Sequence, residues 1–408
     1  MLQGQETTLA FHLRARASTN RPMETKPKVL IMIAAEQISG PGKGVLQLVE
    51  HAAASGFEYV LCNFDRKTHS VGEFVSEAQR RKLDLRLLRQ RTALDPALIV
   101  QARRLVQNHD IEIIQTHGYK SNTIGFLLRI LCRRPWIGFA HGFIEVGWKN
   151  RLYNRIERLV LRRADRVVAV SGAMKELLVR HGIGAHKVRV IHNAIAPRES
   201  IPGASGLEVR QRHGIAPSDK VVGVFGRLNP EKGQRVLLKA LETTVRSVQG
   251  VKVLIVGDGQ DRVALEEFCR RRGLSNHVLF LGYRKDIPDY YGAIDLLVQP
   301  SFSEGSPNTV LEAMSFGVAV LATAVGGVPE IIQNGNGVMV PPNDPDALAS
   351  KMIELLADPM FRREIGEKGR SSLYPRFSAD TRVREIVGLY DELLTERSTT
   401  RSSCKSAW

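Results

Sequence analysis

The sequence predicts an α/β protein with two domains, each built on a parallel β-sheet flanked by helices. Short apolar segments alternate with helical patterns along the chain, which is typical of parallel sheets. The length of 408 residues suits two domains of about 200 residues each. With 43% hydrophobic and 25% charged residues, the chain has enough apolar material for two ordinary cores. No apolar run reaches about eighteen residues, so no membrane-spanning helix is predicted.

Thirteen short apolar segments are predicted to be strands. In the first half they begin near residues 28, 57, 85, 111, 136, 166 and 187. In the second half they begin near residues 221, 251, 277, 295, 318 and 337. A polar stretch rich in Pro and Gly separates the halves and predicts a junction near 195–215. This pattern predicts two Rossmann-like domains. Ligands of such sheets bind beyond the carboxyl ends of the strands. We therefore expect one cleft between the domains.

These features divide the chain into five segments. The predicted segments are a disordered basic leader (1–27), an N-terminal Rossmann-like domain (28–200), a C-terminal Rossmann-like domain (201–377), a C-terminal helix packing back toward the N-terminal domain (378–395) and a flexible tail (396–408). The leader lacks the apolar core of a secretory signal, and Met23 is a second candidate start. The four cysteines lack C-x-x-C spacing, which fits a reducing cytoplasm and disfavours a zinc site.

Positive charge is concentrated in the first half. Residues 1–200 hold 32 Lys and Arg against 17 Asp and Glu, whereas the remainder holds 26 against 25. Segments 80–91 and 149–166 place Arg beside Leu, Ile and Val, as in surfaces that bind anionic lipid head groups. The helical spacing of apolar residues in 149–166 equally predicts a core-facing side. Nucleic acid is the rival partner, but the sequence has no DNA-binding motif and only 6% aromatic residues.

Two carboxylates in the second half stand eight residues apart, in the segment EGSPNTVLE. Glu304 is predicted in the loop after a strand and Glu312 about one turn, or roughly 5 Å, into the next helix, so both face one crevice. The first-turn N–H groups of Asn308, Thr309 and Val310 lack intrahelical partners and predict an anion site. Because carboxylates accept pairs of sugar hydroxyls, the segment predicts a sugar-nucleotide site. The alternative is a chance spacing with Glu312 on a solvated helix face.

A second strand, loop and helix start occurs at GRLNPEKG, residues 226–233. Arg227 offers a fork of donors that matches phosphate geometry, and Lys232 adds a compact positive charge. Both side chains would neutralise a diphosphate. The alternative is that they are ordinary surface cations.

The first half contributes GPGKG, directly after the first strand. Gly42 and Gly44 would permit close approach of the backbone to a phosphate, and Lys43 adds charge. The spacing is not that of a Walker A loop, and a flexible turn is the alternative. His117 and His141 each end a strand and would project into the cleft. We expect one of the two to be functional and choose His141, in FAHGF.

The order of these motifs resembles that of the family-4 retaining glycosyltransferases, which have the GT-B fold. The resemblance extends from about residue 28 to residue 342, and further toward the helix near Glu392. It rests on GPGKG with its following helix, FAHGF, RVVAVSGAMKELL, VIHNAI, GRLNPEKG, VLIVGDG, FLGYRKDI, SFSEGSPNTVLEAMSFGVAVLAT and GGVPEII ending in NGNGVMVPP.

This resemblance implies a hexosyltransferase that takes a hexose from a nucleotide sugar with retention at the anomeric carbon. The residues that would act at the reacting centre are His141, Glu304, Arg227 and Lys232. Arg227 and Lys232 would bind the donor diphosphate, and Glu304 would hold hydroxyls of the transferred sugar. His141 would lie near the anomeric centre. A front-face transfer and a double displacement both stay open.

A second group of residues would bind the rest of the donor. Glu312 would accept hydrogen bonds from the nucleotide ribose, and residues 282–284 would border the base. Backbone amides of residues 42–44 and 308–310 would help to bind the diphosphate. The complete donor-binding group is Gly42, Lys43, Gly44, Gly282, Tyr283, Arg284, Asn308, Thr309, Val310 and Glu312.

No metal or other cofactor is implied, because Arg, Lys and helix ends stabilise the leaving diphosphate. The D-x-D formed by Asp344 and Asp346 is predicted to cap a helix instead. UDP-linked hexoses are expected ahead of GDP-mannose. The neighbourhood of Lys43 and Val45 lacks the acidic residue that the family often carries, so the acceptor-side role of this loop stays open.

The basic, acceptor-binding first half predicts a lipid-linked or envelope saccharide as acceptor, in polysaccharide or lipopolysaccharide biosynthesis. The expected location is cytoplasmic, peripheral at the inner face of the cell membrane, with an anionic membrane surface as partner. Two other functions compete with this hypothesis. One is another GT-B enzyme such as a nucleotide-sugar epimerase, and the other is a non-catalytic basic protein that binds membranes or nucleic acid.

Overall fold

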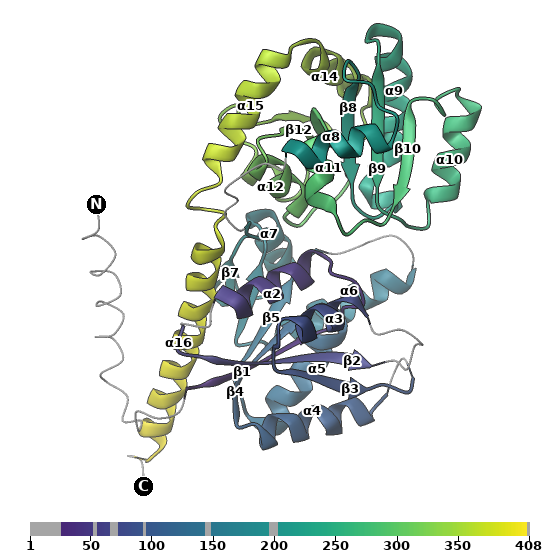
Figure 1. The fold of residues 1–408 in the computed structure, drawn as a ribbon. Coiled ribbons are helices and arrows are strands. Elements are labelled where there is room, and N and C mark those ends of the chain that lie inside the picture. Colours follow the sequence, from purple (N-terminus) through teal and green to yellow (C-terminus); the bar gives the residue numbers. More distant parts are fainter. Residues whose placement is uncertain are drawn as a thin grey trace.

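The computed structural model describes residues 26–51, 55–65, 72–92, 95–142, 148–195 and 203–405. The chain forms two lobes, one above the other in Figure 1, and each lobe has a β-sheet covered by helices. The predicted leader, residues 1–27, lies outside the described residues except for its last two positions.

The N-terminal lobe alternates strands and helices from its first described strand. Its elements are β1 (Lys28–Ile33), α2 (Gly40–His51), β2 (Glu58–Asp65), α3 (Glu73–Arg80), β3 (Leu85–Arg89), α4 (Ala97–Asn108), β4 (Ile111–His117), α5 (Tyr119–Cys132), β5 (Trp136–Ala140), α6 (Trp148–Leu161), β6 (Arg166–Ala169), α7 (Gly172–Arg180), the 3-10 helix η3 (Ala185–Lys187) and β7 (Val188–Val190).

The C-terminal lobe repeats the alternation and ends in three consecutive helices. Its elements are α8 (Gly203–Arg212), β8 (Lys220–Phe225), the 3-10 helix η4 (Pro230–Lys232), α9 (Gln234–Ser247), β9 (Val251–Val256), α10 (Arg262–Arg271), β10 (Val278–Gly282), α11 (Ile287–Ala293), β11 (Leu296–Gln299), α12 (Asn308–Ser315), β12 (Ala319–Thr323), α13 (Val328–Ile331), β13 (Val338–Val340), α14 (Pro345–Ala357), α15 (Pro359–Ser372) and α16 (Ala379–Lys405).

Both sheets are wound in the same way. The N-terminal sheet has the order β3-β2-β1-β4-β5-β6-β7 and the C-terminal sheet has the order β10-β9-β8-β11-β12-β13. The paired strands within each sheet run parallel. The strand order reverses between β1 and β4 and between β8 and β11, and ligands of doubly wound sheets bind beside such switch points. The prediction of two parallel-sheet domains is confirmed.

The strands read as continuous apolar runs because helices cover both faces of each sheet. In β1, the side chains of Val29, Leu30, Ile31 and Met32 are fully buried. These residues divide between two core clusters, one on each face of the sheet.

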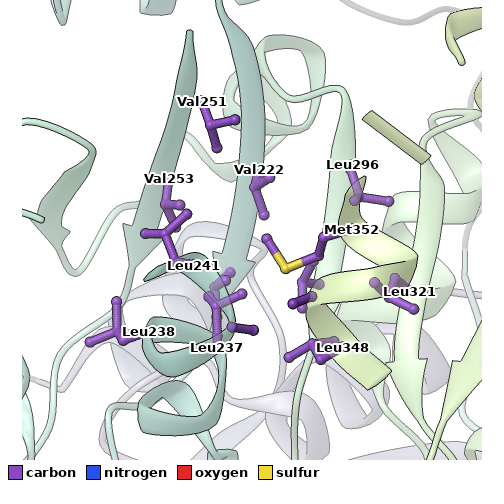
Figure 2. Close-up of a cluster of buried hydrophobic side chains, with 14 of the residues drawn as sticks. Val222, Leu237, Leu238, Leu241, Val251, Val253, Leu296, Leu321, Leu348 and Met352 are labelled. Carbon is purple, nitrogen blue, oxygen red and sulfur yellow. The ribbon is translucent and has the colours of Figure 1, made fainter. Parts of the chain in front are cut away.

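One face of the C-terminal sheet is covered by α9 and α14 (Figure 2). Leu237 and Leu241 of α9 stand one turn apart, as do Leu348 and Met352 of α14, and these side chains point at the strands. The helix side chains pack against Val222 of β8 and other buried residues of the same sheet. Full burial of such a side chain stabilises the fold by about 1.5–3 kcal/mol, so this cluster fixes the sheet that carries the donor-side loops.

The last helix, α16, packs on the N-terminal lobe although it follows the C-terminal lobe in sequence (Figure 1). Ile386, Leu389, Tyr390 and Leu393 repeat at helical spacing and are buried in the same cluster as Ile31. The N-terminal lobe is therefore completed by residues from the end of the chain.

The chain crosses between the lobes twice, and the two crossings are hydrogen-bonded to each other. Ile195 forms an isolated parallel bridge with Ser378, and the Ile195 N–H donates to the Phe377 carbonyl at 2.9 Å. The two connecting segments thus lie side by side at Ile195 and Ser378.

The C-terminal helix is longer than predicted. A helix over 378–395 and a flexible tail over 396–408 were expected, whereas α16 continues to Lys405. Residues 396–405 contain no Gly or Pro, the residues that normally end a helix, so the helix continues through a polar sequence. The predicted end of the helix at residue 395 is thus moved to Lys405. None of the described helices has the length and apolar character of a membrane span.

Candidate active site

The loops after β5 and β11 meet at the junction of the lobes. A Cβ atom built on Gly305 would lie 2.1 Å from the carbonyl oxygen of His141, so only glycine permits this approach. On the other side of the junction, a Cβ atom on Gly40 would lie 3.1 Å from Nδ2 of Asn308. The structure therefore brings the predicted His141 of one lobe against the Glu304 loop of the other.

Glu304 is held by three donors from its own lobe. Its Oε1 atom accepts from Lys232 Nζ at 2.7 Å, Gln299 Nε2 at 2.6 Å and Ser301 Oγ at 2.7 Å. The Glu304 side chain is 7% exposed. Its other oxygen, Oε2, accepts no hydrogen bond from the residues that the structure describes. One oxygen is thus used to orient the carboxylate, and the other is left as an acceptor.

Glu312 lies in the second turn of α12, and both of its oxygens are occupied. Tyr291 Oη donates to Oε2 at 3.0 Å, and Lys43 Nζ donates to Oε1 at 2.6 Å. Lys43 belongs to the N-terminal lobe and its side chain is 41% exposed, whereas that of Glu312 is 10% exposed. This ion pair bridges the lobes and joins two of the predicted donor-binding residues.

The start of α12 has no side-chain cap. Pro307 is the N-cap residue, and the first backbone bond of the helix runs from the Leu311 N–H to the Pro307 carbonyl. The N–H groups of residues 308–310 precede this bond, as the sequence predicts. Thr309 Oγ1 donates to Gln299 Oε1 at 2.9 Å, while Asn308 Oδ1 is buried and has no hydrogen-bond partner in the described part of the chain. An uncapped helix start beside an unsatisfied buried oxygen is suited to a polar ligand.

The remaining donor-side residues lie around η4 and after β10. Arg227 is exposed, and its carbonyl accepts from Gln234 Nε2 at 2.9 Å. Tyr283 reaches the other lobe, where its hydroxyl donates to Glu73 Oε2 at 2.5 Å. Burial raises the pKa of Tyr283, and the adjacent carboxylate of Glu73 adds to the effect. The Nε atom of Arg284 is buried and has no partner among the described residues.

The glycines at 42 and 44 lie within the first turns of α2 and are buried. A Cβ on Gly42 would lie 3.3 Å from the Phe74 ring, and one on Gly44 would lie 3.1 Å from Arg382 Nη2. Their small size lets α2 pack closely on α3 and α16. That their backbone amides contact a phosphate stays a prediction, and Lys43 between them reaches the junction.

His141 and His117 are bonded to each other. His117 Nδ1 and His141 Nε2 are 2.9 Å apart, and the rings are nearly parallel with centroids 5.1 Å apart. His117 is 4% exposed and also stacks on Phe139 at 4.4 Å. Only one of the pair was expected to matter, but the contact makes His117 a direct neighbour of His141.

Arg382 of α16 lies close to both histidines. Its Nη1 donates to the His192 carbonyl at 2.8 Å and to Asn193 Oδ1 at 3.0 Å. Burial, followed by the charge of Arg382, lowers the pKa of His141 to about 3. Burial also lowers the pKa of His117 well below its ordinary value, followed by the effects of His141 and Arg382. Both imidazoles are therefore neutral at neutral pH.

A further contact between the lobes was not predicted. Glu330 of α13 accepts from the Gly172 N–H at 2.9 Å and from the Ala173 N–H at 3.2 Å, at the start of α7. A carboxylate at a helix N-terminus is favourable because of the helix dipole. Glu330 was given no role from sequence because its partners lie 158 and 157 residues away. Gln299 and Ser301 were also given none, although both lie within five residues of Glu304.

The described residues contain no cluster of His, Cys, Asp or Glu arranged to hold a metal ion. Asp344 is the N-cap of α14, and its side chain accepts from the Ala347 N–H at 2.9 Å. The prediction that this D-x-D segment caps a helix is confirmed.

Comparison with known proteins agrees with these observations. Residues 207–372 match the model for glycosyl transferases group 1, and residues 38–199 match the model for Glycosyltransferase Family 4. The D-inositol 3-phosphate glycosyltransferase of Corynebacterium urealyticum is 30% identical over 309 residues, 70% of this chain and 72% of that protein. The UDP-Gal:alpha-D-GlcNAc-diphosphoundecaprenol alpha-1,3-galactosyltransferase of Escherichia coli is 23% identical over 314 residues, 74% of this chain and 81% of that protein.

The fold also has close counterparts among solved structures. Anabaena HepE in complex with UDP-glucose superposes with a TM-score of 0.79 at 24% identity, covering 90% of this chain and 99% of HepE. This similarity confirms the GT-B fold, and the sequence relatives confirm the prediction of a glycosyl-transferring enzyme. The chain belongs to glycosyltransferase family 4.

Proposed function

We propose that the protein is a retaining glycosyltransferase that transfers a hexose from a UDP-sugar to a hydroxyl of a lipid-linked or envelope saccharide. The observation that carries this proposal is the arrangement of Glu304, whose Oε1 is fixed by three donors while Oε2 is left as an acceptor. The Glu304 carboxylate is fixed through one oxygen, and its loop packs against His141. Its other oxygen is suited to hold hydroxyls of a sugar at the junction of the lobes.

In this proposal, the diphosphate lies between Lys232, Arg227 and the uncapped start of α12. These positive groups stabilise the charge that develops on the leaving diphosphate, so transfer needs no metal ion. The base lies beside residues 282–284, where the buried Nε of Arg284 has no hydrogen-bond partner among the described residues. A UDP donor is supported by the likeness to HepE, whose structure contains UDP-glucose.

Donor binding would change the partners of Glu312. The ribose hydroxyls compete with Lys43 for Oε1, while Tyr291 keeps Oε2 in place. Lys43, once released, is free to turn toward the diphosphate. The ion pair thus gives each of these two charged groups a partner before the nucleotide binds.

Transfer would proceed with retention. The acceptor hydroxyl attacks from the face on which the diphosphate leaves, and His141 and Glu304 orient the hexose. Closure of the lobes excludes water from the reacting centre, so hydrolysis of the donor is slower than transfer.

The acceptor side is supported by charge and by exposed apolar residues on α6. Trp148 is 71% exposed, Leu152 47% and Leu159 50%, and several Arg residues share this helix. The alternative that the apolar residues of α6 face the core holds for Leu161, which is fully buried, but not for these three. Basic and apolar side chains on one surface helix suit an anionic lipid surface, which would hold the enzyme next to a lipid-linked acceptor.

The donor is tested by calorimetric titration of UDP, GDP and ADP in excess chelator. Micromolar binding of UDP alone supports the proposal, whereas tight binding of GDP alone would assign a different donor. UDP-glucose and UDP-galactose are then incubated with and without a lipid-linked saccharide. An anomerically retained glycoside that forms only with acceptor supports transfer. Conversion of the UDP-sugar without acceptor would instead indicate an epimerase.

The membrane surface is tested by sedimentation with vesicles of phosphatidylcholine, with or without phosphatidylglycerol. Binding should need the anionic lipid, weaken with salt and fall in Leu152→Ser. Leu207→Ser is the matched control, because Leu207 is 63% exposed on α8 of the other lobe. Equal loss in both variants, or equal binding to neutral vesicles, would contradict the proposed surface.

A further inference from the structure

Four side chains, of which Tyr390, Gln115 and His117 are buried, form a continuous line of hydrogen bonds from α16 to His141. Tyr390 Oη donates to Gln115 Oε1 at 2.5 Å, Gln115 Nε2 contacts His117 Nε2 at 2.8 Å, and His117 Nδ1 contacts His141 Nε2 at 2.9 Å. Tyr390 and Gln115 are fully buried, and His117 is 4% exposed. The line therefore begins in the core of the N-terminal lobe and ends beside the Glu304 loop.

The orientation of the Gln115 amide, with its oxygen toward Tyr390 and its nitrogen toward His117, gives this line a single direction. An amide nitrogen only donates, so His117 Nε2 must accept from Gln115 and carry no proton. A neutral imidazole then has its proton on Nδ1, and His117 Nδ1–H donates to His141 Nε2. The same reasoning places the remaining proton of His141 on its Nδ1.

The far end of the line is unsatisfied. His141 Nδ1 is shielded from solvent and has no hydrogen-bond partner among the described residues. A buried N–H without a partner is rare in folded proteins and costs free energy unless a ligand completes it. Every other polar contact in the line is made within the protein.

Arg382 supports this arrangement by keeping both histidines neutral. Burial and the nearby guanidinium lower the pKa of His141 to about 3 and move that of His117 in the same direction. A protonated imidazole would donate from both nitrogens, and the line would lose its direction. Arg382 and Tyr390 both come from α16, two turns apart.

We propose that Tyr390, Gln115 and His117 are positioning residues that fix His141 as the Nδ1–H tautomer, so that it presents one N–H donor to an oxygen of the transferred sugar. This inference rests on the proposed function for the identity of the ligand, but the tautomer itself is a property of the free protein. The other tautomer would present a lone pair at this position and could not donate to that oxygen.

The tautomers are measured by two-bond 1H–15N correlation spectra of protein containing 15N-labelled histidine. Signals of His117 and His141 are identified from their loss in His117→Asn and His141→Asn. The expected result for the wild type is a proton on Nδ1 of both residues at neutral pH. A proton on Nε2 of His141 would overturn the proposal.

Gln115→Glu reverses the line while changing few atoms. A carboxylate only accepts, so it would accept a hydrogen bond from His117 Nε2–H, and both histidines would become Nε2–H tautomers. Turnover with the UDP-sugar should then fall roughly 100-fold with the donor KM within about threefold, because the lost donor acts on the reacting sugar. Unchanged tautomers together with unchanged turnover would overturn the proposal.

Tyr390→Phe removes the hydroxyl that orients the Gln115 amide, and mixed tautomers with a smaller loss of turnover are expected. Tyr59→Phe is the matched control, since its ring lies 6.4 Å from that of Tyr390 but its hydroxyl contacts Ser55. Nδ1–H tautomers in a protein that turns over no nucleotide sugar would refute the proposed function and retain the line. Turnover of a nucleotide sugar by a protein whose His141 carries its proton on Nε2 would refute the proposed tautomer and retain the proposed function.

Discussion

The two lobes share one fold, but they build their parts of the site in different ways. In the C-terminal lobe, Glu304 is oriented by Gln299 and Ser301, which lie within five residues of it, and by Lys232 from the neighbouring switch-point loop. In the N-terminal lobe, His141 depends on Gln115 and His117 from another strand and on α16 from the end of the chain.

This difference separates a locally built half-site from one assembled over long distances in sequence. The half-site around Glu304 uses one charge pair with Lys232 and two hydrogen bonds from residues close in sequence. The other half uses neutral groups in a low-dielectric environment, where each hydrogen bond is stronger and each unpaired group is costlier. Substitutions in the C-terminal half-site should therefore change mainly the rate of transfer. Substitutions in the N-terminal half-site should change mainly the protonation of the site.

The largest effect is expected from Glu304→Gln. The substitution keeps the size of the side chain but removes the charge that Lys232 pairs with, and it weakens the acceptor for sugar hydroxyls. We expect kcat with a UDP-sugar to fall about 100- to 1000-fold with folding intact. Steady-state kinetics and a thermal melt measure the two properties separately.

Glu267→Gln is the control, because Glu267 forms ion pairs with Arg270 and Arg271 on the exposed surface of α10. Surface pairs of this kind contribute little to stability. Equal kcat values for Glu304→Gln and the wild type would refute the assignment of the donor half-site.

An intermediate effect is expected on the pH dependence of stability. The pKa of His141 falls from 6.5 to about 3 on folding, so between these values the unfolded chain binds more protons than the folded one. Stability therefore falls as the pH is lowered through this window, and it is fully present above about pH 6.5. His141→Asn removes this contribution, and Tm should decline less steeply between about pH 7 and about pH 5.

The difference between the two Tm slopes reports His141 together with its effect on the pKa of His117, because the other titrating groups are common to both proteins. His51→Asn serves as the control because His51 is exposed on α2. Parallel slopes in all three proteins would show that His141 titrates normally in the folded state.

The smallest effect is expected from Glu330→Gln, which acts on the contact between the lobes. The variant retains an acceptor for the α7 amides but loses the charge that the helix start favours, a change of about 0.3–1 kcal/mol. The closed arrangement should be populated less, and the donor KM should rise by up to about fivefold. Small-angle scattering should show a larger radius of gyration.

Glu364→Gln on the exposed face of α15 should change neither quantity. An unchanged radius and KM in Glu330→Gln would mean that the two lobes are held together by other contacts, such as the Lys43 and Glu312 pair.

Much of the fold followed from local patterns. Each predicted strand is present because an apolar run between turn residues has few alternatives once helices cover both faces of a sheet. The pairing of Glu304 with the start of α12 was also predictable, since one loop and one helical turn fix their separation. The buried packing of Gly42 and Gly44 was not, because it depends on Phe74 and Arg382.

The sequence by itself determined the two parallel-sheet domains, the donor-side loops and the residue types that suit a sugar nucleotide, because these depend on neighbours within one or two elements. Only the tertiary structure decided which groups meet across long distances. Lys43 and Glu312 are 269 residues apart, and Tyr390 and Gln115 are 275 apart. Such contacts arise when two lobes and a returning helix pack together, and no local periodicity encodes which side chains will then face one another.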